Sequence, residues 1–153
     1  MDTLKERIKQ QKFNSVAQEA FLSIFMTSTV LRDQFLKSIK GSGITMAQYN
    51  ILHILKGAYP QGYPRYAISE RMIERAPDIT RLIDRLIKRD LVERKQCQED
   101  RRRSMAFITP AGLELLAELD LRVDSFLKEF EVNIGEETLS QIITLCEVIL
   151  LKY

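Results

Sequence analysis

The chain has 153 residues, of which 45% are hydrophobic and 29% are charged, and its net charge at neutral pH is +2. These values are typical of one globular domain and exclude a disordered or low-complexity chain. Polar residues interrupt every apolar stretch before the roughly 20 residues that a membrane span needs, and residues 1–10 are too charged for a signal peptide, so we expect a cytoplasmic protein with no membrane partner.

The first part of the chain predicts two helices. Apolar residues recur at steps of three and four over residues 12–40, which is typical of one long amphipathic helix, and Gly41 ends it. Thr45 followed by Gln48 has the form of a capping box, which predicts the start of a second helix. That helix ends at Gly57.

A turn and two further helices are predicted next. The prolines and glycine of residues 59–64 predict the turn, and a short helix follows over about Arg65 to Ile73. Pro77 is suited to the first position of a helix that runs to Arg89. One face of this helix is apolar and the opposite face is charged. The apolar residues are Ile79, Leu82, Ile83, Leu86 and Ile87, and the charged ones are Asp78, Arg81, Asp84, Arg85, Lys88 and Arg89.

A β-hairpin and two C-terminal helices complete the prediction. Residues 91–97 and 104–109 are short runs with strand-forming residues, separated by a charged tip at 98–103. Thr109 as N-cap and Pro110 after it start a long helix, and a last helix runs nearly to the end of the chain. The predicted fold is therefore mainly α with a small β-hairpin wing, in the order of a winged helix-turn-helix.

Positive charge gathers in the central part of this arrangement. Residues 65–103 contain 12 lysines and arginines against 8 acidic residues, a net +4, whereas the remainder has 11 against 13, a net −2. A helix fits the major groove of B-DNA, and an arginine-rich loop fits the adjacent minor groove. The pattern therefore predicts a protein that binds double-stranded DNA.

At these residues the sequence resembles the MarR family of transcriptional regulators. The matching segments are 68–72 (ISERM), 79–86 (ITRLIDRL), 91–94 (LVER) and the wing residues Asp100, Arg101 and Arg102, followed by Thr109 and Gly112. The resemblance covers nearly the whole chain. It implies a single MarR-like domain over 1–153, with a winged helix-turn-helix over about 44–109 and dimerisation helices over about 1–43 and 110–153.

Roles in DNA binding are assigned on this basis. Asp78 and Thr80 near the helix start are expected at phosphates or base edges, and Arg81 and Arg85 in the major groove. In the wing, Arg102 is expected in the minor groove, and the resemblance implies that Asp100 is a scaffold for the wing. The full set of predicted DNA-binding residues is Pro77, Asp78, Thr80, Arg81, Arg85, Arg101, Arg102 and Arg103.

The terminal helices predict a homodimer, because they carry more large apolar residues than one winged domain needs to cover. The predicted dimerisation residues are Phe13, Val16, Leu139, Ile142, Ile143, Cys146 and Ile149. The resemblance also implies a small aromatic or phenolic effector that releases a repressor from its operator. Tyr49 and His53, four residues apart on one helix face, are candidate ligand-binding residues.

Two alternatives stay open at the level of sequence. One is a winged-helix module that binds an acidic protein instead of an operator. The other is a regulator switched by oxidation of Cys97, which precedes the wing and lies near basic residues. An enzyme is not expected, because the sequence lacks the common catalytic motifs, and two cysteines with one histidine predict neither a metal site nor a cofactor.

Overall fold

The computed structural model describes residues 3–74, 77–96 and 104–153. By its internal contacts the chain divides into two compact units, residues 1–38 and residues 39–153. The division of the chain into a DNA-binding part and dimerisation parts remains a prediction.

The first unit contains a short helix, α1 (Leu4–Arg7), and a long one, α2 (Val16–Ser38). The sequence predicted one helix from residue 12, but α2 begins later because Ser15 caps it, with its hydroxyl accepting a hydrogen bond from the backbone N–H of Gln18 at 3.1 Å. Phe13 therefore lies before the helix. Helix α1 was not predicted, although the side chain of Glu6 accepts from the backbone N–H of Thr3 as in a capping box.

The second unit contains the remaining helices, and their starts follow local capping signals. Thr45 and Gln48 form the predicted reciprocal pair at the start of α3, at 3.3 and 3.0 Å. The hydroxyl of Thr109 likewise accepts from the N–H of Gly112 at 3.0 Å at the start of α6. The helices of this unit are α3 (Met46–Gly57), α4 (Arg65–Arg71), α5 (Ile79–Ile87), α6 (Pro110–Ile134) and α7 (Glu136–Leu150).

A small antiparallel sheet of order β1-β3-β2 lies in the same unit. Strands β2 (Val92–Gln96) and β3 (Ser104–Ile108) form the predicted hairpin, with Val92 opposite Ile108. The third strand, β1 (Tyr63–Pro64), was expected to be part of a turn, but it pairs with the other edge of β3. A strand of two residues is too short to show the alternating pattern by which strands are predicted from sequence. The assignment of β1 as a strand therefore depends on its pairing with β3.

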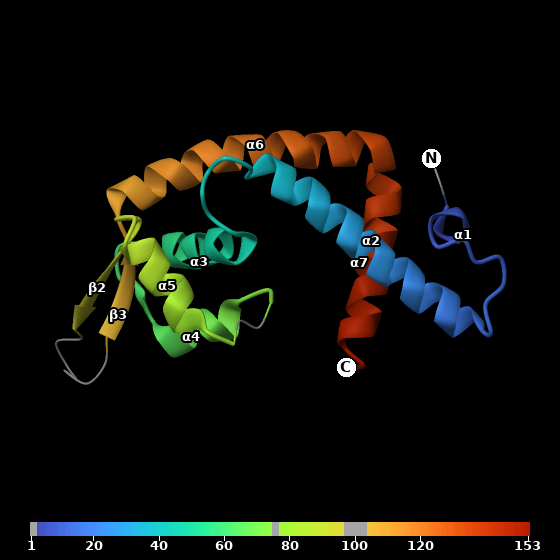
Figure 1. Ribbon diagram of the computed structural model, residues 1–153, viewed down its shortest axis with the longest axis horizontal. Helices are drawn as coiled ribbons and strands as arrows, with labels where there is room; N and C mark the ends of the chain where they lie inside the picture. The colour runs from blue at the N-terminus through green and yellow to red at the C-terminus, as the bar shows by residue number, and fades with distance from the viewer. Residues whose placement is uncertain (1–2, 75–76, 97–103) are drawn as a thin grey trace. The chain divides into compact units, whose positions relative to one another are not determined.

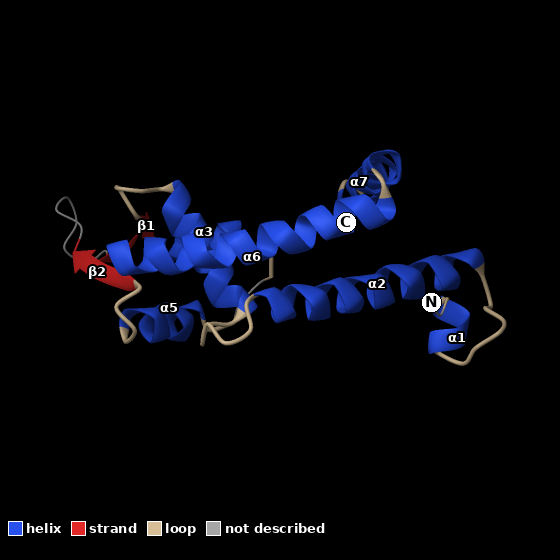
Figure 2. Ribbon diagram, turned by 90° about the horizontal axis from the view of Figure 1, so that it is seen from above, coloured by secondary structure: helices blue, strands red, loops and turns tan. Residues whose placement is uncertain are grey.

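The core of the second unit lies between α6 and the helices of the helix-turn-helix. Figures 1 and 2 show α3 alongside the first half of α6, with α5 and the sheet at the same end and α7 at the other end. The most deeply buried side chains come from α3, α4, α5, β2 and α6, so these elements share one core. These side chains are Ile51, Leu52, Leu55, Ile68, Leu86, Val92, Leu116 and Leu119. This arrangement confirms the predicted mainly α fold with a winged helix-turn-helix.

Among the described residues, none of the helices combines the length and the apolarity needed to cross a lipid bilayer.

Candidate nucleic-acid interface

Helix α5 has the two opposite faces that the sequence predicts for a recognition helix. Ile79, Ile83 and Leu86 are buried, with 6%, 2% and 0% of their surface exposed. Arg81 and Arg85 are exposed on the other side of the helix. Burial of one face fixes the helix on the core and leaves the basic face free to contact a polyanion.

The start of α5 is set by Asp78 and not by Pro77. The carboxylate of Asp78 accepts a hydrogen bond from the backbone N–H of Arg81 at 3.1 Å, which makes Asp78 the N-cap and Ile79 the first helical residue. The predicted position of Pro77 as first helical residue is therefore wrong, and Pro77 lies exposed before the cap. Asp78 also forms an ion pair with the Arg81 side chain, with Nε and Oδ2 2.9 Å apart, and this contact orients the guanidinium.

Thr80 is contacted by a residue that the sequence analysis did not single out. Nη1 of Arg65 donates a hydrogen bond to the Thr80 hydroxyl at 3.3 Å. Arg65 is the first residue of α4, so this contact joins the two helices of the helix-turn-helix at their N-terminal ends. The sequence signal for Arg65 was its position directly after Pro64. Its partner Thr80 is 15 residues away, and no local pattern identifies that contact.

Helix α5 is also tied to the wing strands. Nη2 of Arg94 on β2 donates to the carboxylate of Asp84 at 2.6 Å. Asp84 thus lies on the charged side of α5 as predicted, but its carboxylate binds Arg94 and so connects α5 to β2. The predicted wing residues Asp100, Arg101, Arg102 and Arg103, together with Cys97, lie outside the described residues, so their roles remain predictions.

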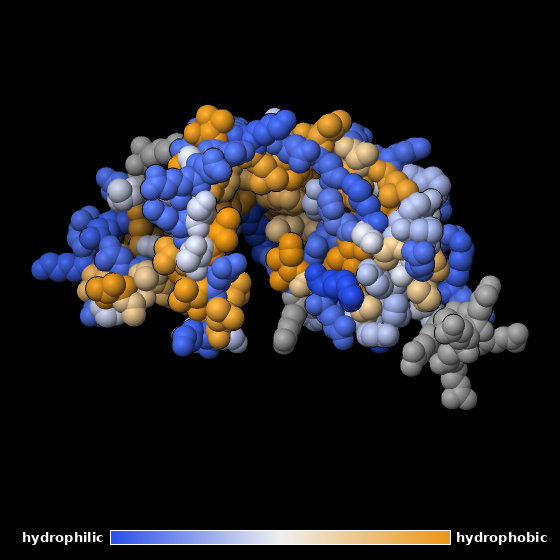
Figure 3. Space-filling model, turned by 180° about the vertical axis from the view of Figure 1, so that it is seen from behind, coloured by the Kyte–Doolittle hydropathy of each residue, from blue (hydrophilic) through white to orange (hydrophobic). Residues whose placement is uncertain are grey.

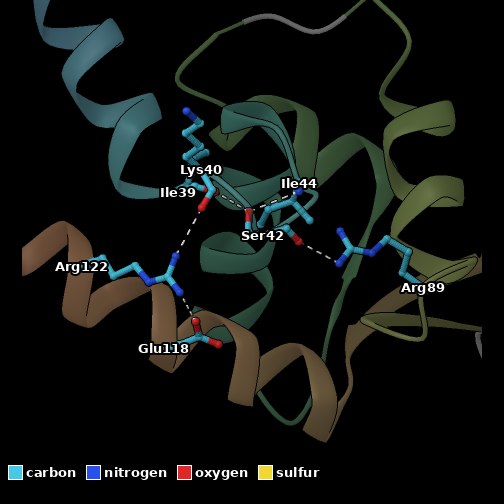
Figure 4. Close-up of polar contacts among 7 residues, drawn as sticks. All are labelled: Ile39, Lys40, Ser42, Ile44, Arg89, Glu118 and Arg122. Carbon is cyan, nitrogen blue, oxygen red and sulfur yellow. Dashed lines mark hydrogen bonds and ion pairs between the residues drawn. The ribbon is translucent and has the colours of Figure 1, made fainter.

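Two arginines hold the segment that precedes α3, residues 39–44 (Figure 4). Arg89, just after α5, donates from Nη2 to the backbone carbonyl of Ser42 at 2.9 Å. Arg122 on α6 donates to the carbonyl of Lys40 at 3.4 Å and is itself held by Glu118. Arg89 was predicted on the charged face of the recognition helix, whereas this contact shows that it anchors the end of that helix to the 39–44 segment.

Tyr49 and His53, the predicted ligand-binding pair, converge on Asp120 of α6. The Tyr49 hydroxyl donates to Oδ1 of Asp120 at 2.8 Å, and Nε2 of His53 lies 2.9 Å from the same oxygen. Lys56 donates to Oδ2 at 3.0 Å. A ligand at Tyr49 and His53 would therefore compete with Asp120, which the sequence analysis missed because it lies 71 residues from Tyr49.

The contacts in this cluster shift two pKa values. Burial, the hydrogen bond to Asp120 and the charges of Asp120 and Asp124 raise the pKa of Tyr49 well above its usual range. Burial alone would raise the pKa of Asp120, but the hydrogen bonds from Tyr49 and Lys56 and the charges of His53 and Lys56 outweigh burial and lower it. The cluster is thus built around an ionised Asp120.

Asp120→Asn should lower the free energy of unfolding by about 2 kcal/mol at neutral pH, because hydrogen bonds to a charged group are lost. A depressed pKa in the folded state gives stability that is present above the unfolded pKa, about 3.9, and is lost as pH falls through the folded pKa. The difference between wild type and variant should therefore shrink below about pH 4 in urea titrations. Asp124→Asn, an exposed carboxylate one turn further along α6, is the control, and an equal loss in both variants would contradict the assignment.

Large apolar side chains remain exposed along α7. Ile143, Leu145 and Val148 are 60%, 64% and 55% exposed. Figure 3 shows hydrophobic surface along this helix, which lies below the end of α6 in Figure 1 and left of centre in Figure 3. Of the predicted dimerisation residues, Ile142, Cys146 and Ile149 are also exposed and Leu139 is partly so. In the first unit Val16 is 85% exposed and Phe13 is partly buried, beneath the ammonium group of Lys5.

The chain is similar to known proteins over most of its length. A family model described as the MarR family matches residues 44–104. The chain is 30% identical over 121 residues to the HTH-type transcriptional regulator MhqR of Bacillus subtilis (strain 168), covering 73% of this chain and 81% of that protein. The crystal structure of a MarR transcription factor from Planctomyces limnophilus is 34% identical, with a TM-score of 0.68 and coverage of 90% of this chain and 99% of that one.

A second solved structure supports the fold alone. The transcriptional repressor CouR, bound to a 23-mer DNA duplex, is 21% identical and has a TM-score of 0.79, covering 92% of this chain and 98% of that one. The fold, the motifs and the two more similar proteins agree. The chain belongs to the MarR family of transcriptional regulators.

Proposed function

We propose that this chain binds a specific operator as a homodimer and represses transcription until a small-molecule effector releases it. The observation that carries this proposal is the exposed basic face of α5, with Arg81 and Arg85 opposite a buried apolar face. Side chains at the start of such a helix reach base edges in the major groove. The DNA-bound state of CouR, which has the same fold, supports the assignment.

The homodimer is supported by the apolar surface of α7. A helix whose apolar residues extend around most of its circumference is ordinarily buried. Here Ile143 and Leu145, two residues apart, point to nearly opposite sides of α7, and Ile142 and Val148 lie on either side of Leu145; all four are exposed in the single chain. A second copy that covers this surface would also duplicate α5, which favours an operator with two related half-sites.

The operator is tested by selecting bound duplexes from a random pool with the full chain. We expect enrichment of a pseudo-palindrome whose half-sites lie about 10–10.5 bp apart, and binding that weakens steeply with salt. Absence of any enriched sequence, with binding of an acidic protein instead, would favour the protein-interaction module. A site without two-fold symmetry would contradict the symmetric dimer.

Ile143→Asp should weaken the dimer about thirtyfold, or roughly 2 kcal/mol, because it places a charge in the proposed apolar interface. Sedimentation velocity over a concentration series measures the change. Ser140→Asp, which adds the same charge on the polar side of α7, is the control and should leave the association constant unchanged. A wild-type chain that stays monomeric at all concentrations would refute the dimer.

The effector is proposed to act at Tyr49 and His53 on α3. Both side chains already contact Asp120, so a small aromatic or phenolic ligand that binds them would replace one of these contacts and loosen α3 from α6. A release screen on the selected operator tests this. A compound that releases wild type but has no effect on His53→Gln or Tyr49→Phe would support the location, whereas equal release of all three proteins would place the ligand elsewhere.

A further inference from the structure

A small concavity of about 250 Å³ lies where α4, α5 and the sheet meet. It is called the basin here and is lined by Arg65, Thr80, Ile83, Arg94, Ser104 and Ala106. Its floor is apolar, since Ile83 and Ala106 are buried. Its rim is polar, since the other four residues carry a guanidinium or a hydroxyl group. Arg65, Arg94 and Ser104 are exposed and therefore accessible from solvent.

The fold brings these residues together from separate parts of the chain. Arg94 on β2 lies opposite Ala106 on β3, and Ser104 is two residues before Ala106, so the three share one face of the sheet. Thr80 and Ile83 are three residues apart and share one face of α5. Arg65 joins them from the start of α4.

Both guanidinium groups of the basin are held in place. Arg65 donates from Nη1 to Thr80 at 3.3 Å, and Arg94 donates from Nη2 to Asp84 at 2.6 Å. A guanidinium group has five N–H donors, so these contacts occupy only a small part of each group's capacity. Asp84 is not among the residues that line the basin, and its carboxylate fixes Arg94 from outside. The rim thus presents two oriented guanidinium groups, of which that of Arg94 is ion-paired with Asp84, and two hydroxyl groups.

We propose that the basin binds a phosphate group and, building on the proposed function, that it holds one backbone phosphate of the operator beside α5. Paired guanidinium groups with hydroxyl donors match the charge and the several acceptor oxygens of a phosphate. A volume of about 250 Å³ is below the range of roughly 300–1,000 Å³ that drug-sized ligands occupy, which favours a small protruding group. A free phosphate group has the same chemistry, and the experiment distinguishes the two sources.

The test compares wild type with Arg65→Gln on the selected operator and on an unrelated duplex over a series of salt concentrations. Loss of one phosphate contact should weaken both complexes by the same factor, about five- to tenfold at 0.1 M salt, and should lower the slope of log K against log salt by about 1. Arg65→Lys should retain the slope and lose only part of the affinity, because it keeps the charge but not the planar fork. Unchanged affinity and slope in Arg65→Gln, together with no effect of this variant on phosphate binding, would overturn the proposal.

Matched variants separate the basin from general effects of charge and folding. Lys128→Gln removes one positive charge near the C-terminal end of α6 and should leave the slope unchanged. Ser104→Ala removes a rim hydroxyl without changing charge, and we expect a roughly twofold loss on both duplexes with an unchanged slope. If Arg65→Gln fails to fold, Arg65→Lys and Ser104→Ala still decide the proposal, and full affinity in both would refute it.

A calorimetric titration of inorganic phosphate into the DNA-free protein forms the second arm. Phosphate binding that Arg65→Gln abolishes, with DNA affinity unaffected by the same variant, would assign the basin to a free phosphate. Failure of wild type to bind any duplex would refute the proposed function but not the basin, which the phosphate titration would then decide alone. Loss of affinity on the operator only, with no change on the unrelated duplex, would overturn the phosphate assignment, since a backbone contact is independent of sequence.

Discussion

Gly112→Ala should lower the free energy of unfolding by about 3 kcal/mol, which corresponds to a fall in melting temperature of roughly 6–12 °C for a chain of this size. A Cβ atom at this position would lie 2.2 Å from the backbone oxygen of Leu91 and 2.8 Å from Cγ1 of Ile108. The Leu91 oxygen has little freedom to move, because it accepts a hydrogen bond from the N–H of Thr109 at 3.2 Å. The substitution would therefore separate the first turn of α6 from the end of the sheet.

Gly57→Ala is the matched control for this prediction. Gly57 is the last residue of α3, and a Cβ atom there meets nothing within 4 Å. Alanine at a helical position with open space should be neutral or stabilise the chain by up to about 1 kcal/mol. Thermal and urea unfolding followed by circular dichroism measure both variants. Equal stability of Gly112→Ala and wild type would mean that the close approach of Gly112 and Leu91 does not exist in solution.

Arg81→Ala should weaken binding to the selected operator by about 1–3 kcal/mol, roughly 5- to 150-fold, with a smaller loss on unrelated DNA. Arg81 lies in the first turn of α5, its side chain is 80% exposed, and Asp78 orients it. A larger loss on the operator than on unrelated DNA distinguishes contact with a base from contact with a phosphate. Fluorescence anisotropy with labelled duplexes measures both affinities.

Folding effects should not hide the result, because an exposed ion pair such as that of Arg81 and Asp78 contributes at most about 1 kcal/mol to stability. Lys128→Ala provides the control for loss of one charge. Arg102→Ala tests the residue that the sequence places in the minor groove. Full operator affinity in both Arg81→Ala and Arg102→Ala would contradict the roles assigned to Arg81 in the major groove and to Arg102 in the minor groove.

The parts of the fold that sequence predicted are those fixed by neighbouring residues. The caps at Thr45 and Thr109 each depend on a partner three residues away, so the starts of α3 and α6 were predicted correctly. The same reasoning failed at Pro77, because two adjacent residues both favour a helix start and the carboxylate of Asp78 is the one that accepts the N–H of Arg81. The cap at Ser15 was available in the sequence but was hidden by apolar residues that extend the helical period before it.

The candidate sites were predicted less completely, because their partners are distant in sequence. Spacing placed Tyr49 and His53 on one face of α3, and both indeed contact one group, but that group is Asp120 on α6. The contact of Arg65 with Thr80 and the pairing of β1 with β3 likewise depend on tertiary packing. No periodicity or local motif contains that information.

The segment 39–44 is held by hydrogen bonds to its backbone and should therefore tolerate many side-chain substitutions. Arg89 and Arg122 hold the main-chain oxygens of Ser42 and Lys40, which every amino acid possesses. The identity of the side chain at position 40 can therefore drift in evolution without breaking the anchor. Gly43 is the exception, since its φ is +72° and a Cβ atom there would lie 3.1 Å from the Arg89 guanidinium. A library of variants across this segment should accept many residues at position 40 and very few at position 43.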